Sequence, residues 1–153
     1  MLYSKFGLTA VALLLVTALP AQSKCTAITL SALQVIENTA PDQKESKILS
    51  AGFDLRQAVL QKDNVTKVYS KCWVVSGGKK DYFEHKLFWD AKNDSIKFAM
   101  LNEQDFQSYR KELDERHPSG AGASVVVGKK FTYYLGFEKI DNMDYYTLTL
   151  VKN

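Results

Sequence analysis

The sequence has few of the residues that enzymes most often use for chemistry. It contains two cysteines and two histidines in 153 residues. It has no Gly-x-Ser-x-Gly nucleophile elbow and no glycine-rich phosphate-binding loop. The two histidines, His85 and His117, lack metal-site spacing with each other and with the carboxylates. These absences argue against a serine hydrolase, a nucleotide-binding enzyme and a zinc site, and we expect no cofactor.

Strong charge and long apolar runs are also absent. The formal net charge is +3, which is too small to indicate a nucleic-acid partner or a membrane surface. A membrane-spanning helix needs about 20 apolar residues, and no run after the first residues reaches that length. We therefore expect no nucleic-acid partner and no membrane span in the mature protein.

The first residues have the order of a secretory signal. A basic start at Lys5 is followed by an apolar run over 6–19 and by small residues at Ala21 and Ser23. This pattern predicts a signal peptide over residues 1–23, cleaved after Ser23 or, as the second choice, after Ala21. The remaining residues, 24–153, are of the right length for a single domain, and we expect a secreted or periplasmic protein.

The two cysteines, Cys25 and Cys72, are an even number in a chain expected to be secreted. That count predicts one disulfide, which would fasten the start of the mature chain to the rest of the domain. Two free buried thiols are the alternative.

Periodicity predicts helices and strands in separate runs. Helical spacing indicates helices over 31–38, 44–62 and 103–116, with a capping box at Ser31 and Gln34 and a glycine, Gly52, inside the second helix. Period-two alternation indicates strands at 65–75, 82–90, 95–101, 125–127, 131–138 and 145–152. This order is typical of an α+β fold, and we expect an antiparallel meander sheet wrapped over one or two helices.

One turn sequence occurs twice. Residues 73–80 read WVVSGGKK and residues 124–130 read SVVVGKK, so in both places two valines lead to glycine and a lysine pair. Glycine supplies the positive φ that tight hairpins need. The repeat indicates two halves, each a helix followed by strands, although the halves otherwise align poorly.

These Val-Val-x-Gly turns resemble the hairpin of the cystatin-like fold. Val75 with Gly77, and Val126 with Gly128, match the family's valine and glycine. The resemblance covers residues 44–101, or 103–152 in the second copy. Cystatins inhibit papain-like cysteine proteases with this hairpin, assisted by an N-terminal glycine and a later Pro-Trp hairpin. Here Trp73 and Ser124 stand in the place of the family's glutamine and no Pro-Trp pair exists, so the resemblance supports the fold more than the inhibitory activity.

The absence of a catalytic set and the two turns predict a small secreted, non-enzymatic protein-binding module. Its partner would be another protein, and it would act as an inhibitor of a hydrolase or a host-directed effector. The expected contact residues are at the hairpin tips: Trp73, Val74, Val75, Ser76, Gly77, Gly78, Val126, Val127 and Gly128.

Two alternatives remain open. A secreted ribonuclease-like hydrolase would use His85 and His117 as acid and base. A small-ligand carrier would enclose an apolar cavity between the sheet and a helix.

Overall fold

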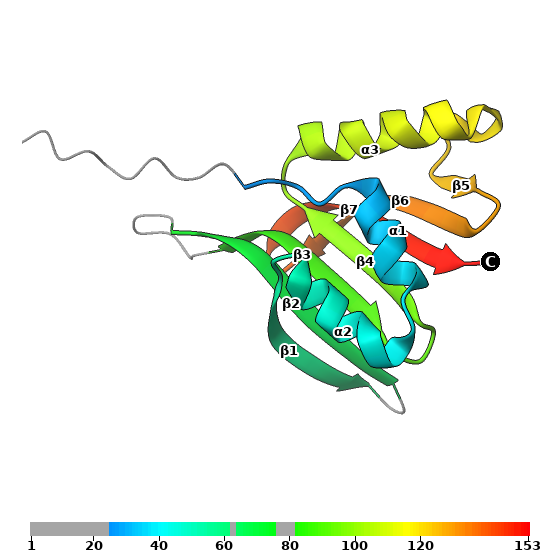
Figure 1. Ribbon diagram of the computed structural model, residues 1–153. Helices are drawn as coiled ribbons and strands as arrows, with labels where there is room; N and C mark the ends of the chain where they lie inside the picture. Colours follow the sequence, from blue (N-terminus) through cyan, green and yellow to red (C-terminus); the bar gives the residue numbers. More distant parts are fainter. Residues whose placement is uncertain (1–24, 62–63, 76–81) are drawn as a thin grey trace, which may run out of the picture.

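The computed structural model describes residues 25–61, 64–75 and 82–153. These residues form three α-helices, one short 3₁₀ helix (η1) and seven strands (Figure 1). In chain order the elements are α1 (Leu30–Asn38), α2 (Pro41–Ser50), β1 (Asp54–Gln61), β2 (Asn64–Val74), β3 (Tyr82–Asp90), β4 (Ser95–Met100), α3 (Glu103–Arg116), η1 (Pro118–Gly120), β5 (Val125–Val127), β6 (Phe131–Ile140) and β7 (Met143–Lys152).

All seven strands belong to one antiparallel sheet with the order β1-β2-β3-β4-β7-β6-β5. The sheet therefore holds a four-stranded meander, β1-β2-β3-β4, and a three-stranded meander, β5-β6-β7, which meet through β4 and β7. The expectation of an α+β fold with an antiparallel sheet is confirmed, and the arrangement in two halves agrees with the repeated turn. The finer prediction of a cystatin-like fold stays a prediction.

One face of the sheet carries the helices and the core. The side chains of Leu87, Phe98, Leu148 and Leu135 lie in register across β3, β4, β7 and β6, and each is buried. The helices cover this face (Figure 1) and add buried side chains from α1 and α2 (Leu30, Leu33, Ile36, Ile48) and from α3 (Phe106, Tyr109, Leu113). Each fully buried side chain of this kind contributes roughly 1.5–3 kcal/mol, so this layer is the main source of stability.

Two of the three helices begin where side-chain caps place them. Asn102 accepts a hydrogen bond from the backbone N–H of Gln104 and starts α3 as expected. α1 starts one residue earlier than expected, because Thr29 caps it by accepting from the N–H of Ala32. The capping box predicted at Ser31 and Gln34 is therefore wrong, and the Gln34 amide donates instead to the Tyr133 hydroxyl.

The helix expected over 44–62 is wrong in its second half. α2 ends at Ser50, and Gly52, with φ of +85°, follows as the left-handed residue that closes a helix. Its N–H donates to the Leu49 carbonyl. The chain then continues as β1, an edge strand that pairs with β2. Pairing with a neighbouring strand thus outweighs the weak helical spacing of Leu55 and Val59.

A buried ionic group ties both N-terminal helices to the β3–β4 turn. The Lys44 ammonium is fully buried and lies 3.6 Å from a carboxylate oxygen of Glu37 and 2.5 Å from one of Asp94. It also donates to the Glu37 carbonyl at 3.1 Å. Burial of the Glu37 carboxyl raises its pKa from 4.5 to about 7; Lys44 opposes this shift and Asp94 adds to it. No hydrogen bond satisfies either carboxylate oxygen of Glu37 within the described residues.

No helix in the described ranges is both long and apolar enough to cross a membrane.

Glu37→Gln should change how stability depends on pH. Between pH 4.5 and 7 the folded wild-type chain retains a proton on Glu37 that the unfolded chain has released. The free energy of unfolding should therefore fall as pH rises through this window, by roughly 3 kcal/mol in total, and Glu37→Gln should lack this component. Urea unfolding at pH 4.5, 6 and 8 would measure the difference. Glu115→Gln on the exposed face of α3 is the control, and parallel pH profiles for wild type and Glu37→Gln would contradict the assignment.

Candidate functional site

The first repeated turn begins with an exposed aromatic cluster. Trp73 is 54 % exposed and Val75 is 63 % exposed. The Trp73 ring packs edge-on against Phe83 with 4.7 Å between centroids, and the Arg56 guanidinium lies over the Phe83 ring at 4.7 Å. A register shift between Leu55 and Gln57 marks the position of Arg56 in β1. We call Arg56, Trp73, Val75 and Phe83 the Trp73 cluster. Val74 is half-buried beside it, and the predicted contact residues Ser76, Gly77 and Gly78 lie outside the described residues.

The second turn offers a smaller surface. Val127 is 70 % exposed, but Val126 is only 1 % exposed and belongs to the core. Gly128 sits against the protein itself: a Cβ at this position would lie 2.9 Å from Cε1 of His117 and 3.0 Å from the Phe131 carbonyl oxygen. Of the three residues expected to contact a partner here, only Val127 therefore presents an apolar side chain to solvent.

The sheet register places the two turns at opposite ends of the sheet. The pair Trp73 and Phe83 lies beyond His85, which is opposite Met100 at the end of β4. Phe131 is opposite Lys152, beyond the pair Ile96 and Leu150 at the start of β4. The two turns also lie on opposite flanks of the sheet (Figure 1). They form two separate surfaces and not one joint contact site.

The two histidines are also far apart. His85 is buried in β3 and its Nε2 lies 3.7 Å from the Asp105 carboxylate, in the first turn of α3. His117 follows the last turn of the same helix and lies beside Tyr133, with 5.9 Å between ring centroids. Twelve residues of helix at 1.5 Å per residue separate the two ends by roughly 18 Å. An acid–base pair made of His85 and His117 cannot reach one phosphodiester.

The predicted disulfide is confirmed. Cys25 and Cys72 are bonded, with 5.7 Å between their Cα atoms. Both residues are half-buried and line a surface hollow of about 890 Å³ that is open to solvent. Cys72 has φ of 62° although it lies within β2, a conformation that costs a non-glycine residue about 1–2 kcal/mol. The rest of the hollow is lined by Thr26, Lys71, Trp73, Val74, Glu84, Asn102, Gln104 and Asp105.

His85 lies behind this disulfide and is buried, so it does not itself line the hollow. Its Nδ1 lies 3.1 Å from Sγ of Cys25, and its other ring nitrogen faces Asp105. Burial lowers the pKa of His85 below 6.5; the Asp105 carboxylate opposes that shift and the Lys71 ammonium adds to it. The imidazole is thus neutral near pH 7, and an Nε2–H directed at Asp105 leaves the Nδ1 lone pair directed at the sulfur.

The same three residues are a possible metal-ligand set. Sγ of Cys25, Sγ of Cys72 and a ring nitrogen of His85 lie within 4.8 Å of one another. A thiolate, not a disulfide sulfur, is the usual metal ligand, and both sulfurs are bonded to each other here. The residues therefore do not fit a metal while the disulfide is closed.

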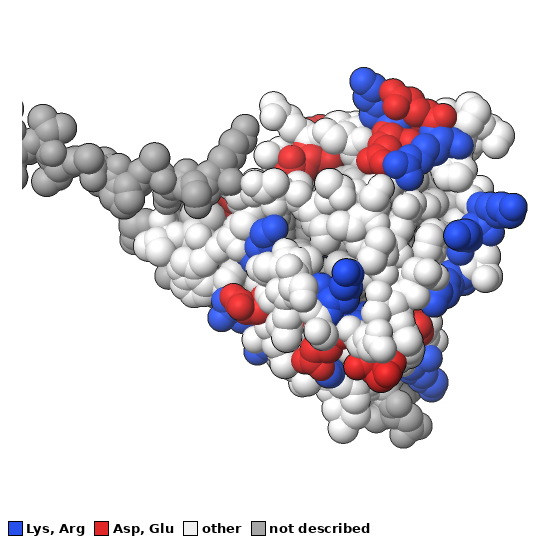
Figure 2. Space-filling model, in the orientation of Figure 1, with Lys and Arg blue, Asp and Glu red and all other residues white. Residues whose placement is uncertain are grey.

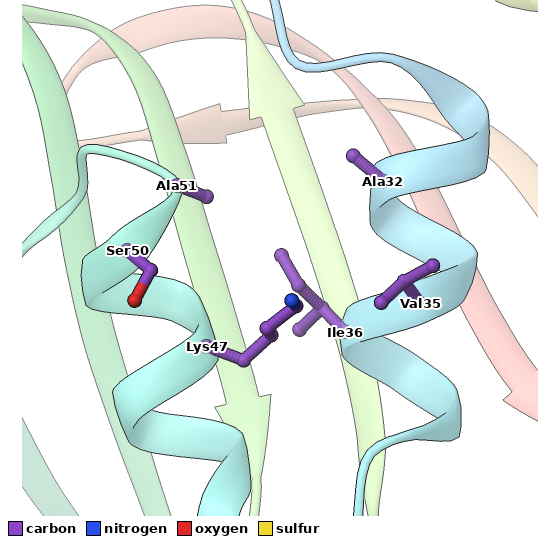
Figure 3. A pocket seen from close by; sticks show the side chains of 6 residues that line it. All are labelled: Ala32, Val35, Ile36, Lys47, Ser50 and Ala51. Atoms are coloured by element: carbon purple, nitrogen blue, oxygen red, sulfur yellow. The ribbon is translucent and has the colours of Figure 1, made fainter.

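A second hollow lies between the N-terminal helices. Ala32, Val35 and Ile36 of α1 face Lys47, Ser50 and Ala51 at the end of α2 across a groove of about 330 Å³ (Figure 3). The groove opens to solvent, and the Lys47 side chain reaches across its mouth (Figure 3). The core beneath it is packed, since Leu33, Ile36 and Ile48 are buried. This groove gives little support to the small-ligand carrier, which needs a cavity between sheet and helix.

Charge on the helix-covered face is mixed and not gathered into one patch. Both signs alternate along α3 (Figure 2), where Lys111 pairs with Glu115 and Arg116 with Glu112. A surface of this kind favours solubility over the capture of a polyanion.

Sequence reasoning missed the partners of the candidate site. Phe83 and Arg56 join Trp73 only through the pairing of three strands, and Asp105 reaches His85 from a helix 20 residues later. The one available signal in the sequence is the acidic first turn of α3, with Glu103 and Asp105.

Comparisons with protein-family models, with curated proteins and with solved structures found no match for this chain. The proposals below therefore rest on the geometry of its own residues.

Gly128→Ala should destabilise the fold. The added methyl would press on the His117 ring and on the Phe131 backbone oxygen, and overpacking of this kind costs about 1–3 kcal/mol. Gly120→Ala is the matched control, because a Cβ there would lie 3.6 Å from the nearest atom, a Val126 methyl group, which is an ordinary van der Waals contact. Thermal unfolding would compare the two. Equal melting temperatures for wild type and Gly128→Ala would show that residue 128 is packed less tightly against His117 and Phe131 than described.

Proposed function

We propose that this chain is a small secreted, non-enzymatic module that binds another protein through the Trp73 cluster. The observation that carries the proposal is the exposed Trp73, which packs on the half-buried Phe83, with the Arg56 guanidinium over the Phe83 ring. Trp, Tyr and Arg dominate the binding energy of protein interfaces. A partially exposed tryptophan already held in place loses little side-chain freedom when a partner covers it.

The surroundings of the cluster support a protein partner. The disulfide holds the N-terminal segment at Cys25 beside the end of β2, next to Trp73. Cystatins pair a hairpin with an N-terminal glycine on proteases; here the N-terminal segment lies beside a hairpin end but has no glycine between residues 24 and 51, so a hydrolase partner rests on the position of the segment alone. The second turn is not part of this surface, because it lies at the other end of the sheet.

The alternatives have weaker support. The ribonuclease-like mechanism needs two adjacent histidines, and these lie at opposite ends of α3. A ligand carrier needs an interior cavity, whereas the apolar groove between α1 and α2 is open and shallow against a packed core.

Trp73→Ala should weaken partner binding by about 30-fold or more, which corresponds to about 2 kcal/mol. The partner would be isolated from the native secretome with the wild-type chain, and its dissociation constant measured by calorimetry. Val127→Ala is the matched control, since Val127 is an equally exposed apolar residue at the opposite end of the sheet. Unchanged affinity for Trp73→Ala, or a loss confined to Val127→Ala, would place the contact elsewhere.

Inhibition of a papain-like cysteine protease by the wild-type chain tests the hydrolase version separately. Inhibition that Trp73→Ala abolishes and Val127→Ala retains would support it. Binding of a partner without inhibition of any hydrolase would leave a binding module and remove the inhibitor.

A further inference from the structure

We infer that the Cys25–Cys72 disulfide is an exchange site, opened and closed by thiols, with His85 and Asp105 stabilising Cys25 as the leaving sulfur. The inference does not depend on the proposed binding function. It rests on the position of the disulfide, on the contact between its sulfur and a histidine, and on the way the rest of the N-terminal segment is held.

The disulfide is accessible to a reacting thiol. Both cysteines line the open hollow of about 890 Å³, whereas a disulfide that serves only as a staple can lie wholly inside the core. The Cys72 backbone has a left-handed φ, and strained conformations of this kind concentrate at functional sites. Both features favour a bond that reacts over one that only fastens.

The residues behind Cys25 match what a leaving thiolate needs. A thiolate leaves faster when its conjugate thiol is more acidic, and a neighbouring imidazolium lowers the pKa of a cysteine. His85 presents Nδ1 at 3.1 Å from Cys25 Sγ, and Asp105 presents its carboxylate to the opposite nitrogen. Once the bond opens, a proton taken up at Nδ1 gives a thiolate–imidazolium pair, whose positive ring is held between two negative groups.

The charges around this pair come from several elements. Lys71 of β2 adds positive charge near the thiolate, while Glu84 of β3 and Asp105 of α3 line the hollow with negative charge. Asn102 and Gln104, at the start of α3, also line it. Because these positive and negative charges oppose each other, we expect His85, which contacts Cys25 directly, to have the largest effect on the pKa of the Cys25 thiol.

The exchange balances as follows. An external thiolate attacks Cys72 Sγ and forms a mixed disulfide, while the Cys25–Cys72 bond breaks and its electron pair stays on Cys25 Sγ. His85 takes a proton from water and holds the Cys25 thiolate. A second external thiolate attacks the external sulfur of the mixed disulfide and releases the Cys72 thiolate, which is protonated. Two external thiols are oxidised to one disulfide, and the protein disulfide is reduced to two thiols.

The fold can open this bond without losing α1. The Tyr109 hydroxyl donates to the Ile28 carbonyl, Ile28 is buried, and Thr29 caps the helix. The chain is therefore anchored three residues after Cys25 by contacts that do not involve the sulfur, and only the few residues before Ile28 are released.

The experiment measures opening of the disulfide in the folded protein. Purified protein would be placed in glutathione redox buffers and, separately, with a protein dithiol, and free thiols would be trapped and counted by mass. We expect both the rate of opening and the fraction open to fall by about tenfold in His85→Ala, the equilibrium shift corresponding to about 30 mV. His117→Ala, the same change at a distant histidine, should behave as wild type.

Two further readouts separate this role from a structural one. In the reduced protein, the pH profile of alkylation should show a Cys25 thiol that is more acidic than Cys72, and His85→Ala should remove the difference. Asp105→Asn, at a partly exposed position, should reduce the rate of opening and the acidity of the Cys25 thiol by less than His85→Ala does. This variant tests the inference if His85→Ala does not fold. The trapped mixed disulfide should carry the external thiol on Cys72.

If glutathione opens the disulfide, a small thiol is sufficient as the reductant. If only the protein dithiol opens it, the reductant is a protein. Both outcomes support the inference that this disulfide is an exchange site. A disulfide that resists both reagents in the folded protein would overturn the inference. So would equal rates and midpoints for wild type and His85→Ala, or a mixed disulfide on Cys25.

Discussion

The pairing of β4 with β7 is the interaction on which the rest of the structure depends. Phe98 lies opposite Leu148, with Ile96 opposite Leu150 and Met100 opposite Tyr146. These six residues bring together strands about 50 positions apart in the chain and join two meanders into one sheet. α3 is placed by the same step, because it follows β4 directly and packs back over β4 and β7. Once α3 is there, Asp105 faces His85 and Tyr109 holds Ile28, so the candidate exchange site is a consequence of this pairing.

The pairing of β4 with β7 also explains why the two repeated turn sequences lie in different surroundings. In a sheet where two meanders meet through their last strands, equivalent turns of the two halves must lie at opposite ends and on opposite flanks. Similar sequences therefore meet different surroundings. Beside the first turn, Trp73 is left half exposed against Phe83; at the second, Val126 enters the core and Gly128 rests on His117. The repeated sequence therefore does not give the two halves a shared contact surface.

The elements that could be predicted from the sequence are those whose signal is local. α3 follows its expectation because Asn102 caps it and Phe106, Tyr109 and Leu113 form one buried stripe. β1 could not be predicted, because it is an exposed edge strand that is held in place by its pairing with β2. Its side chains do not alternate between buried and exposed positions, so the sequence shows no period of two. Gly52, the left-handed glycine after α2, is a usable stop signal in the sequence, although the helical spacing on both sides places it inside the predicted helix over 44–62.

The candidate site shows the same division. Trp73 and the two cysteines are visible in the sequence as unusual residues, whereas their partners Phe83, His85 and Asp105 are separated from them by 10 to 80 residues and are ordinary by composition. The same holds for the buried ions, since neither Glu37 nor Lys44 occupies a position that periodicity marks as interior, and Asp94 joins them from the β3–β4 turn. Buried polar contacts of this kind depend on three-dimensional placement, which no window of sequence contains.

Cys72 and Trp73 are consecutive residues, yet their proposed roles depend on different contacts. The Cys25 sulfur contacts the buried His85, and His85 in turn faces Asp105, which lines the hollow. The indole is governed by Phe83 and Arg56, on the side of β1 and β3. The left-handed backbone at Cys72 lies between these two groups. Because the peptide bond after Cys72 joins the two groups, we expect any effect of thiol exchange on Trp73 to pass through this stretch of backbone. A substitution at Trp73 leaves the sulfur's own partners in place, so the coupling is expected to run from the disulfide to the binding surface more strongly than in reverse.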